Sequence, residues 1–196
     1  MAIDTGIGIG CTDLQRTGGI SHICLRQIVE NDVVVVDDAA DTHGYKSIVD
    51  SGGSTASWFV FEFKNETPVM SVAATKENGS TVFECSLSFY LPKMTTTKFH
   101  ELQKLLNTCM AGIVVDTNGT NYVLGLSEKY ANEDVNPFKN QTYLNLSSME
   151  GATGAAYSEE NGITVTLMSR QFELPRTYNT PGVLDINTSA LTATTT

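Results

Sequence analysis

The residues of this chain that could perform catalysis do not occur in the arrangements that catalysis requires. Its three histidines, His22, His43 and His100, are far apart in the sequence, and no Gly-x-Ser-x-Gly motif accompanies them. A nucleophilic triad needs a histidine beside a serine or cysteine, with a carboxylate that orients it. We therefore predict that the histidines are structural or incidental, and that the protein is not an enzyme.

The sequence also lacks the motifs that bind metals and cofactors. The chain has no Cys-x-x-Cys, His-x-x-x-His or calcium-loop spacing. The acidic cluster Asp37, Asp38 and Asp41 is interpreted as a solvated charge cluster in a loop. The segment Gly6-Ile-Gly8-Ile-Gly10 resembles part of a phosphate-binding loop but lacks the strand and helix that such a loop joins. We expect no metal and no cofactor.

Aromatic side chains offer a third kind of chemistry, stacking on a sugar or a base. Trp58 is followed by Phe59, Phe61 and Phe63, which fall on one face of a predicted strand over 57–64. A buried aromatic face is the favoured interpretation. A carbohydrate-binding β-sandwich that uses Trp58 and Tyr90 is kept as an alternative.

The composition fits one acidic domain. The chain has 196 residues, 41% of them hydrophobic, and a formal net charge of −10, which argues against tight binding to DNA or to an anionic membrane. No secretory signal or membrane-spanning apolar run is visible, so no membrane partner is expected. The four separate cysteines are expected to be free thiols in a reducing cytoplasm.

Alternating side chains predict the elements that must position any functional surface. Residues 82–91 place Phe83, Cys85, Leu87, Phe89 and Leu91 on one face of a strand, opposite a polar face. Further strands are expected at 20–28, 33–36, 57–64, 68–75, 113–116, 122–126 and 163–172, with Asn-Gly turns at 78–79 and 118–119. Apolar positions at three- and four-residue steps predict a helix over about 96–109. The predicted fold class is mainly β, an antiparallel β-sandwich or partial barrel with one flanking helix and extended terminal arms.

Polar, glycine-rich stretches divide the chain into three parts. We predict an N-terminal arm over 1–18, a β domain over 19–175 that contains a long loop at 39–56, and an extended C-terminal tail over 176–196. Such segments have little of their own to pack against, which is typical of a subunit that completes itself in an assembly. The candidate assembly residues are Ile3, Ile7, Ile9, Asp41, Tyr45, Ile48, Tyr178 and Leu184.

Three local elements carry a resemblance to a known family. They are the opening Gly-Gly-Ile at 18–20, the hairpin from Gly112 to Gly125 that contains Val-Asp-Thr-Asn-Gly-Thr-Asn-Tyr-Val-Leu-Gly, and the closing strand that starts at Gly162. With this order of elements, the chain resembles the tail tube (major tail) proteins of tailed bacteriophages, particularly those of phages that infect Bacteroidota. The resemblance covers roughly residues 10–175.

The resemblance implies a structural virion protein that self-assembles into stacked, hexameric rings around a channel for DNA delivery. Its implied partners are further copies of itself, a tape-measure protein, and a terminator or connector protein. DNA would pass through the lumen without specific binding. The implied location is the tail of the virion, after assembly in the cytoplasm of the host bacterium. Another ring, terminator or connector protein of the tail is the main alternative.

The polar faces of two predicted strands are the candidate lining of that lumen. Glu62 lies on the strand over 57–64, and Glu84, Ser86 and Ser88 lie on the strand over 82–91. Carboxylates and hydroxyls in these positions would repel phosphates or leave them unbound, so DNA would not adhere.

Overall fold

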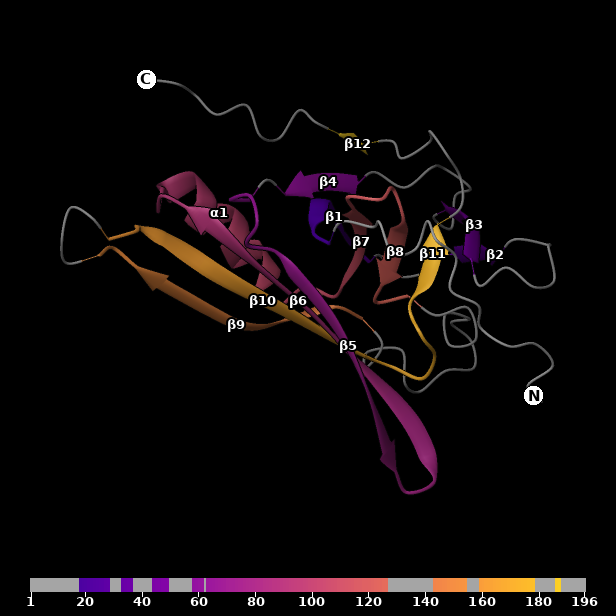
Figure 1. Cartoon of the computed structure of the whole chain (residues 1–196). Helices are drawn as coiled ribbons and strands as arrows, with labels where there is room; N and C mark the ends of the chain where they lie inside the picture. The colour runs from indigo at the N-terminus through magenta and orange to yellow at the C-terminus, as the bar shows by residue number, and fades with distance from the viewer. Residues whose placement is uncertain are drawn as a thin grey trace.

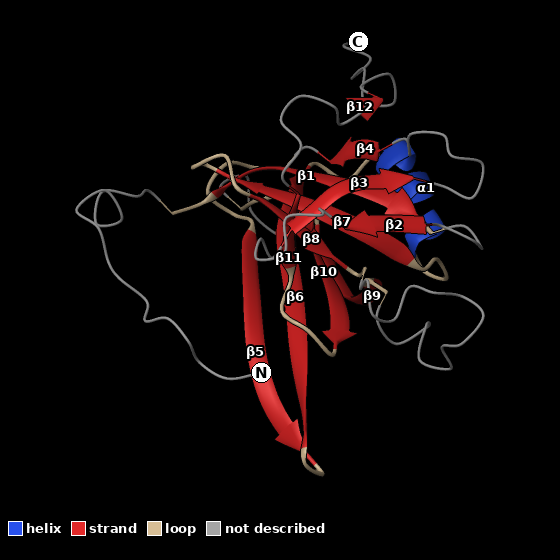
Figure 2. Ribbon diagram, turned by 90° about the vertical axis from the view of Figure 1, so that its right-hand side faces the viewer, coloured by secondary structure: helices blue, strands red, loops and turns tan. Residues whose placement is uncertain are grey.

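The described residues are mainly β, with two sheets and one helix, which confirms the predicted fold class (Figures 1 and 2). The computed structural model describes residues 18–28, 33–36, 44–49, 58–61, 63–126, 143–154, 159–178 and 186–187.

The smaller sheet has four antiparallel strands in the order β5-β6-β10-β9. They are β5 (Val69–Glu77), β6 (Ser80–Pro92), β9 (Asn145–Ala152) and β10 (Gly162–Gln171). Strands β5 and β6 form a long hairpin that extends past the rest of the described chain in both views (Figures 1 and 2). Its turn is the expected Asn-Gly pair, with φ of 47° at Asn78 and 86° at Gly79.

The larger sheet has eight strands in the order β12-β4-β1-β7-β8-β11-β3-β2. Its strands are β1 (Ile20–Gln27), β2 (Val33–Val36), β3 (Gly44–Val49), β4 (Trp58–Phe61), β7 (Met110–Asp116), β8 (Asn121–Leu124), β11 (Arg176–Tyr178) and β12 (Ile186–Asn187). The β7–β8 turn is the second expected Asn-Gly pair, with φ of 82° at Gly119. Strands β11 and β12 bring the end of the chain into both halves of this sheet.

The two faces of the larger sheet contribute to two separate cores. On β7, Met110 and Val114 belong to the first core, whereas Ile113 and Val115 belong to the second. The first core also contains Cys85, Leu87, Phe89 and Leu91 of β6, four of the five residues of its predicted apolar face, together with inward side chains of β10 and the helix. The second core contains Cys24, Tyr45, Trp58, Ala111, Val123, Leu126 and Tyr178.

The helix α1 (Thr96–Leu105) is shorter than predicted and packs a narrower face. Thr95 is its N-cap, and the Thr95 hydroxyl accepts a hydrogen bond from the Lys98 amide at 3.3 Å. Leu102 and Leu105 are buried, but Phe99 and Leu106 are 46% and 50% exposed. The apolar pattern therefore predicted a helix that was too long, and it predicted more buried side chains than the helix has.

Several segments expected to be irregular contain strands. Strand β3 lies within the predicted loop 39–56, and β11 and β12 lie within the predicted tail 176–196. Strand β9 lies in a stretch for which the sequence predicted no strand. These expectations were wrong for those residues, because short strands that join an existing sheet gain hydrogen bonds without needing a periodic apolar pattern.

The aromatic strand packs aromatic side chains on both of its faces, whereas the sequence predicted one buried face. Trp58 is 2% exposed and lies in the second core, whereas Phe59 is 41% exposed. Phe61 and Phe63 pack against the first core, and the Phe61 ring meets the Phe89 ring edge-on with centroids 6.3 Å apart. Both faces of this strand carry aromatic residues, so alternation alone did not identify the buried face.

Candidate functional site

The strongest candidate for a functional surface is the face of the four-stranded sheet that points away from the first core. We call it the open face. On β6 it carries Glu84, Ser86, Ser88 and Tyr90, which alternate with buried residues and are half-buried. The strand register places the following partners beside them: Val69, Ser71 and Ala73 from β5, Thr164, Thr166, Met168 and Arg170 from β10, and Asn145, Ser148 and Glu150 from β9.

Hydroxyl groups dominate the centre of the open face. Across its middle, Ser88 pairs with Thr166, whose hydroxyl donates to the Ser88 hydroxyl oxygen at 3.4 Å, and Thr166 pairs with Ser148 on the other side. In the next row, Ser86 pairs with Ser71 and with the exposed Met168. Such a surface offers many weak, neutral hydrogen-bonding groups.

The charges of the open face are paired. The Arg170 guanidinium Nε lies 3.1 Å from a carboxylate oxygen of Glu84, and both side chains are partly exposed. Lys64, beside the ring of Tyr90 with its ammonium 5.9 Å from the centroid, forms an ion pair with Glu160. Because each cation is matched by a carboxylate, the described face presents little net positive charge to a phosphate backbone.

Two long strands border the open face, and both are edges of the sheet as far as the structure describes the chain. Strand β5 is exposed along almost its whole length, with Val69 at 59% and Val72 at 39% exposure. Strand β9, at the opposite edge, is exposed except for the half-buried Leu146. Edge strands carry unpaired backbone N–H and C=O groups, which makes each a template for pairing with another chain.

The structure brings three of the four predicted lumen residues together. Glu84, Ser86 and Ser88 lie on the open face. Glu62 lies outside the described residues, as do Ile3, Ile7, Ile9, Asp41 and Leu184. Ile48 lies in β3.

Two predicted assembly residues are core residues instead. Tyr45 is fully buried, and its hydroxyl donates to the Leu126 carbonyl oxygen at 3.3 Å. Tyr178 is 8% exposed in the same second core. Each lies on a strand that pairs in register with the other, Tyr178 opposite Tyr45. They therefore complete the fold of the single chain, and they were misassigned because their neighbours in the sequence are polar.

Trp58 is unavailable for stacking on a carbohydrate. It is 2% exposed, and the Arg26 guanidinium lies 5.8 Å from its ring centroid. The alternative that used Trp58 and Tyr90 as a joint sugar platform is corrected on this point, because only the half-buried Tyr90 lies on the open face.

Sequence reasoning missed the residues that β9 and β10 add to the open face. The β10 residues Thr164, Thr166, Met168 and Arg170 alternate with buried Ile163, Val165 and Leu167, so their shared face could have been read from the period-2 pattern. Strand β9 has no such pattern, since most of its side chains are exposed on both faces. Only the tertiary pairing of β9 with β10 shows where Ser148 and Glu150 lie.

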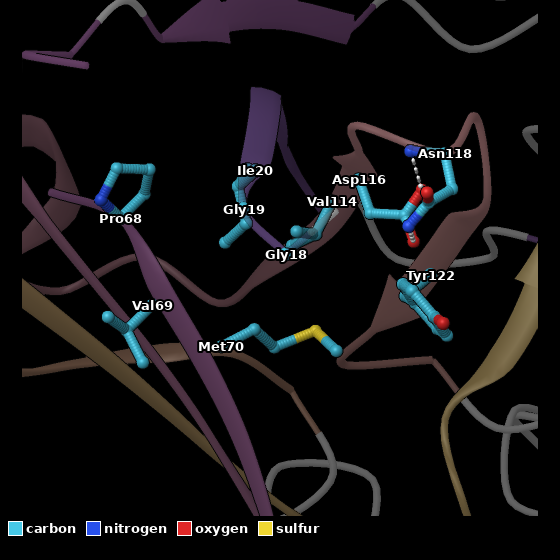
Figure 3. A pocket seen from close by; sticks show the side chains of 10 residues that line it. All are labelled: Gly18, Gly19, Ile20, Pro68, Val69, Met70, Val114, Asp116, Asn118 and Tyr122. Atoms are coloured by element: carbon cyan, nitrogen blue, oxygen red, sulfur yellow. Dashed lines mark hydrogen bonds between the residues drawn. The ribbon is translucent and has the colours of Figure 1, made fainter. Parts of the chain in front are cut away.

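A cavity of about 320 Å³ opens at one end of the space between the two sheets (Figure 3). Its walls come from the start of β1, the start of β5 and the β7–β8 hairpin, with Met70 extending toward Tyr122 in Figure 3. Val114 is a first-core residue, and Ile20, Met70 and Tyr122 pack against that core. The cavity is thus an uncovered end of the first core.

Other chemistry finds little support in the described ranges. Burial raises the pKa of the Cys24 thiol to about 11 and that of Cys85 to about 12, so both are neutral small side chains of the core. No group of metal-ligating side chains occurs among the residues with described positions. No described helix is long and apolar enough to cross a membrane.

Comparisons of this chain with family models, with curated proteins and with solved structures found no match.

Proposed function

We propose that this protein is the subunit of a bacteriophage tail tube, a structural virion protein that forms stacked rings around a channel for DNA. The proposal rests on the resemblance of its hairpin and strand motifs to tail tube proteins. Hexameric rings, tape-measure and terminator or connector partners, and a place in the virion tail after assembly in the host cytoplasm belong to the same proposal.

The observation that carries the proposal is a sheet with one face in the core, one polar open face, and two edge strands, β5 and β9, on either side. If copies stand side by side with β5 of one beside β9 of the next, the sheets continue from copy to copy. A closed ring of such sheets removes the exposed edges of every copy. The open faces then line a single continuous surface.

The chemistry of the open face suits a conduit through which DNA slides. Affinity for DNA comes mainly from Lys and Arg that neutralise phosphates. Arg170 is the one cation among the described β-strand residues of this face, and it is already paired with Glu84. The serine and threonine hydroxyls beside it offer weak contacts that are easily exchanged for water. A strand of phosphates would therefore meet a hydrated surface with little electrostatic attraction.

Electron microscopy of the purified full-length chain tests the proposal. Open-ended tubes with a central channel are the expected result, because every ring presents both of its faces to further rings. Single closed rings would instead support the terminator or connector alternative. A sample that stays monomeric at every concentration and salt condition would contradict both.

Removing the charge of Glu84 tests the role of the open face. Glu84→Gln leaves the guanidinium of Arg170 without its carboxylate, so the assembled protein should retain duplex DNA at low salt and release it as salt rises. The matched control is Glu101→Gln, which removes an equivalent carboxylate of an exposed ion pair on α1. Retention equal in both variants would remove the open face from the DNA path.

A further inference from the structure

The cavity at the end of the first core is open at the point where the N-terminal segment enters the fold. Gly18 and Gly19 form part of its wall, and seventeen residues precede them in the chain. A Cβ atom built on Gly18 would meet nothing within 4 Å. Gly18 is itself exposed, so the described chain begins in open space at the rim of the cavity.

The lining of the cavity selects an apolar occupant. Ile20, Val69, Met70, Val114 and Tyr122 line it, and a methionine wall adapts its shape to what it contacts. A cavity of about 320 Å³ is roughly twice the size of the ~150 Å³ apolar cavities that admit a benzene molecule. It has room for two aliphatic side chains.

The single carboxylate in the wall does not oppose such an occupant. Asp116 already accepts hydrogen bonds at 2.8 Å from the backbone amides of Asn118 and Thr120. Its second oxygen lies 3.4 Å from the side-chain amide of Asn118 (Figure 3). The Asp116 carboxylate is thus hydrogen-bonded within the β7–β8 turn. The occupant of the cavity therefore does not need a positive charge to balance it.

We propose that Ile7 and Ile9 of the same chain fill this cavity and cover the end of the first core. In an extended segment, residues two apart point the same way, about 6.6 Å from each other. Gly6, Gly8 and Gly10 alternate with them, so the opposite side of the segment has no side chains and the backbone can lie close to the wall. This inference is independent of the proposed tail function.

The same chain is favoured over a second copy by the length of the connection. Eight residues separate Ile9 from Gly18, enough for a loop whose closure costs little more than that of a shorter one. A segment tethered this closely acts at an effective concentration of order millimolar. A separate chain would need to reach the same concentration to compete.

Photo-crosslinking from the rim of the cavity tests the proposal. Tyr122 is half-buried, packs against the first core and lines the cavity, so p-benzoylphenylalanine at this position reports what lies inside. In the full-length chain, crosslinks should map to residues 6–10. In an equal mixture of isotopically light and heavy chains, the crosslinked peptides should be light–light or heavy–heavy only.

Matched variants distinguish the docking of Ile7 and Ile9 from a general disturbance of the fold. Ile7→Asp with Ile9→Asp should reduce the crosslinks at least about tenfold, because two aliphatic groups lose their burial. Ile3→Asp, a similar change outside the pair, should leave them unchanged. Light–heavy crosslinks, crosslinks to the C-terminal residues, or none to residues 6–10 would each overturn the proposal, whether or not tubes form.

Discussion

At the residue scale, one glycine allows two distant parts of the chain to come close enough to form a hydrogen bond. Gly125 has a φ of +81°, and a Cβ atom there would lie 2.7 Å from both the Leu144 amide nitrogen and the Met110 carbonyl oxygen. These two atoms are hydrogen-bonded to each other at 2.9 Å. The bond joins β7 to the segment that leads into β9, so Gly125 is required both by its conformation and by its neighbours.

Two alanine substitutions separate these requirements. Gly119 also has a positive φ, +82°, but a Cβ atom there would meet nothing within 4 Å. Gly119→Ala should lower the free energy of unfolding by about 1 kcal/mol through its backbone conformation alone. Gly125→Ala should lower it by at least about 3 kcal/mol, since the backbone must also move. Urea denaturation of the monomeric protein measures the free energy of unfolding of each variant. Equal decreases in the two variants would contradict the close contact at Gly125.

The buried thiols give the chain a predictable response to alkaline pH. Burial raises the pKa of Cys24 from 9.0 to about 11 and that of Cys85 from 9.0 to about 12. In the unfolded chain both thiols ionise near their ordinary pKa, so above it the unfolded state binds fewer protons than the folded state. Stability is fully present below pH 9 and is lost as the pH rises toward the folded pKa values.

Denaturation measured between pH 9 and 11 checks this response. The two thiols together should lower the free energy of unfolding by up to about 2.7 kcal/mol per pH unit in this range. The double variant Cys24→Ala, Cys85→Ala should show a smaller slope, since only the other ionisable groups remain. An identical slope in the variant would show that neither thiol contributes.

At the element scale, the packing of the helix buries only part of its apolar stripe. Phe99, Leu102, Leu105 and Leu106 all fall on the stripe that the sequence predicts, but only Leu102 and Leu105 contact the first core. A short helix that ends at Leu105 lies against the sheet along a single line of contact, so side chains on either side of that line remain in solvent.

Two truncations of the same residue type test this arrangement. Leu102→Ala should cost about 2–5 kcal/mol, because a fully buried side chain leaves a cavity. Leu106→Ala should change the free energy of unfolding by less than about 0.5 kcal/mol, since half of that side chain is already exposed. Thermal or urea denaturation provides the comparison. A large loss at Leu106 would mean that this side chain is covered in solution.

At the scale of the whole molecule, net charge opposes the proposed assembly of copies through their sheet edges. Each copy carries a formal charge of −10, so copies brought together repel one another at low ionic strength. Salt screens this repulsion over distances longer than about 10 Å at 0.1 M. Backbone pairing between edge strands depends much less on salt.

Assembly should therefore increase with ionic strength. Sedimentation of the purified chain at equal protein concentration should give a larger assembled fraction at 0.5 M than at 0.02 M sodium chloride. Replacing Ser148 on β9 with proline should reduce assembly at both salt concentrations, because proline removes a backbone donor and disfavours pairing. Ser147→Ala, a change on the same strand that keeps the backbone donor, is the control. Assembly that decreases with salt would show that attraction between charges holds the copies together.

The sequence by itself determined the elements whose pattern is local. The strict alternation of β6, the strand at β10 and the two Asn-Gly turns appear in the structure where the residues predict them. Period-2 alternation and positive-φ turns are properties of consecutive residues, so no distant partner is needed to read them. For the same reason Glu84, Ser86 and Ser88 could be assigned to one polar face in advance.

Only the tertiary structure decided the features that depend on distant neighbours. Tyr45 and Tyr178 are buried because β3 and β11 pair across more than a hundred residues of sequence, and β9 is a strand because β10 lies beside it. The choice between the two aromatic faces of β4 was settled by the second core, which takes Trp58. Burial is a property of what packs against a residue, and these short, polar or doubly apolar segments carry no local pattern that reveals their partners.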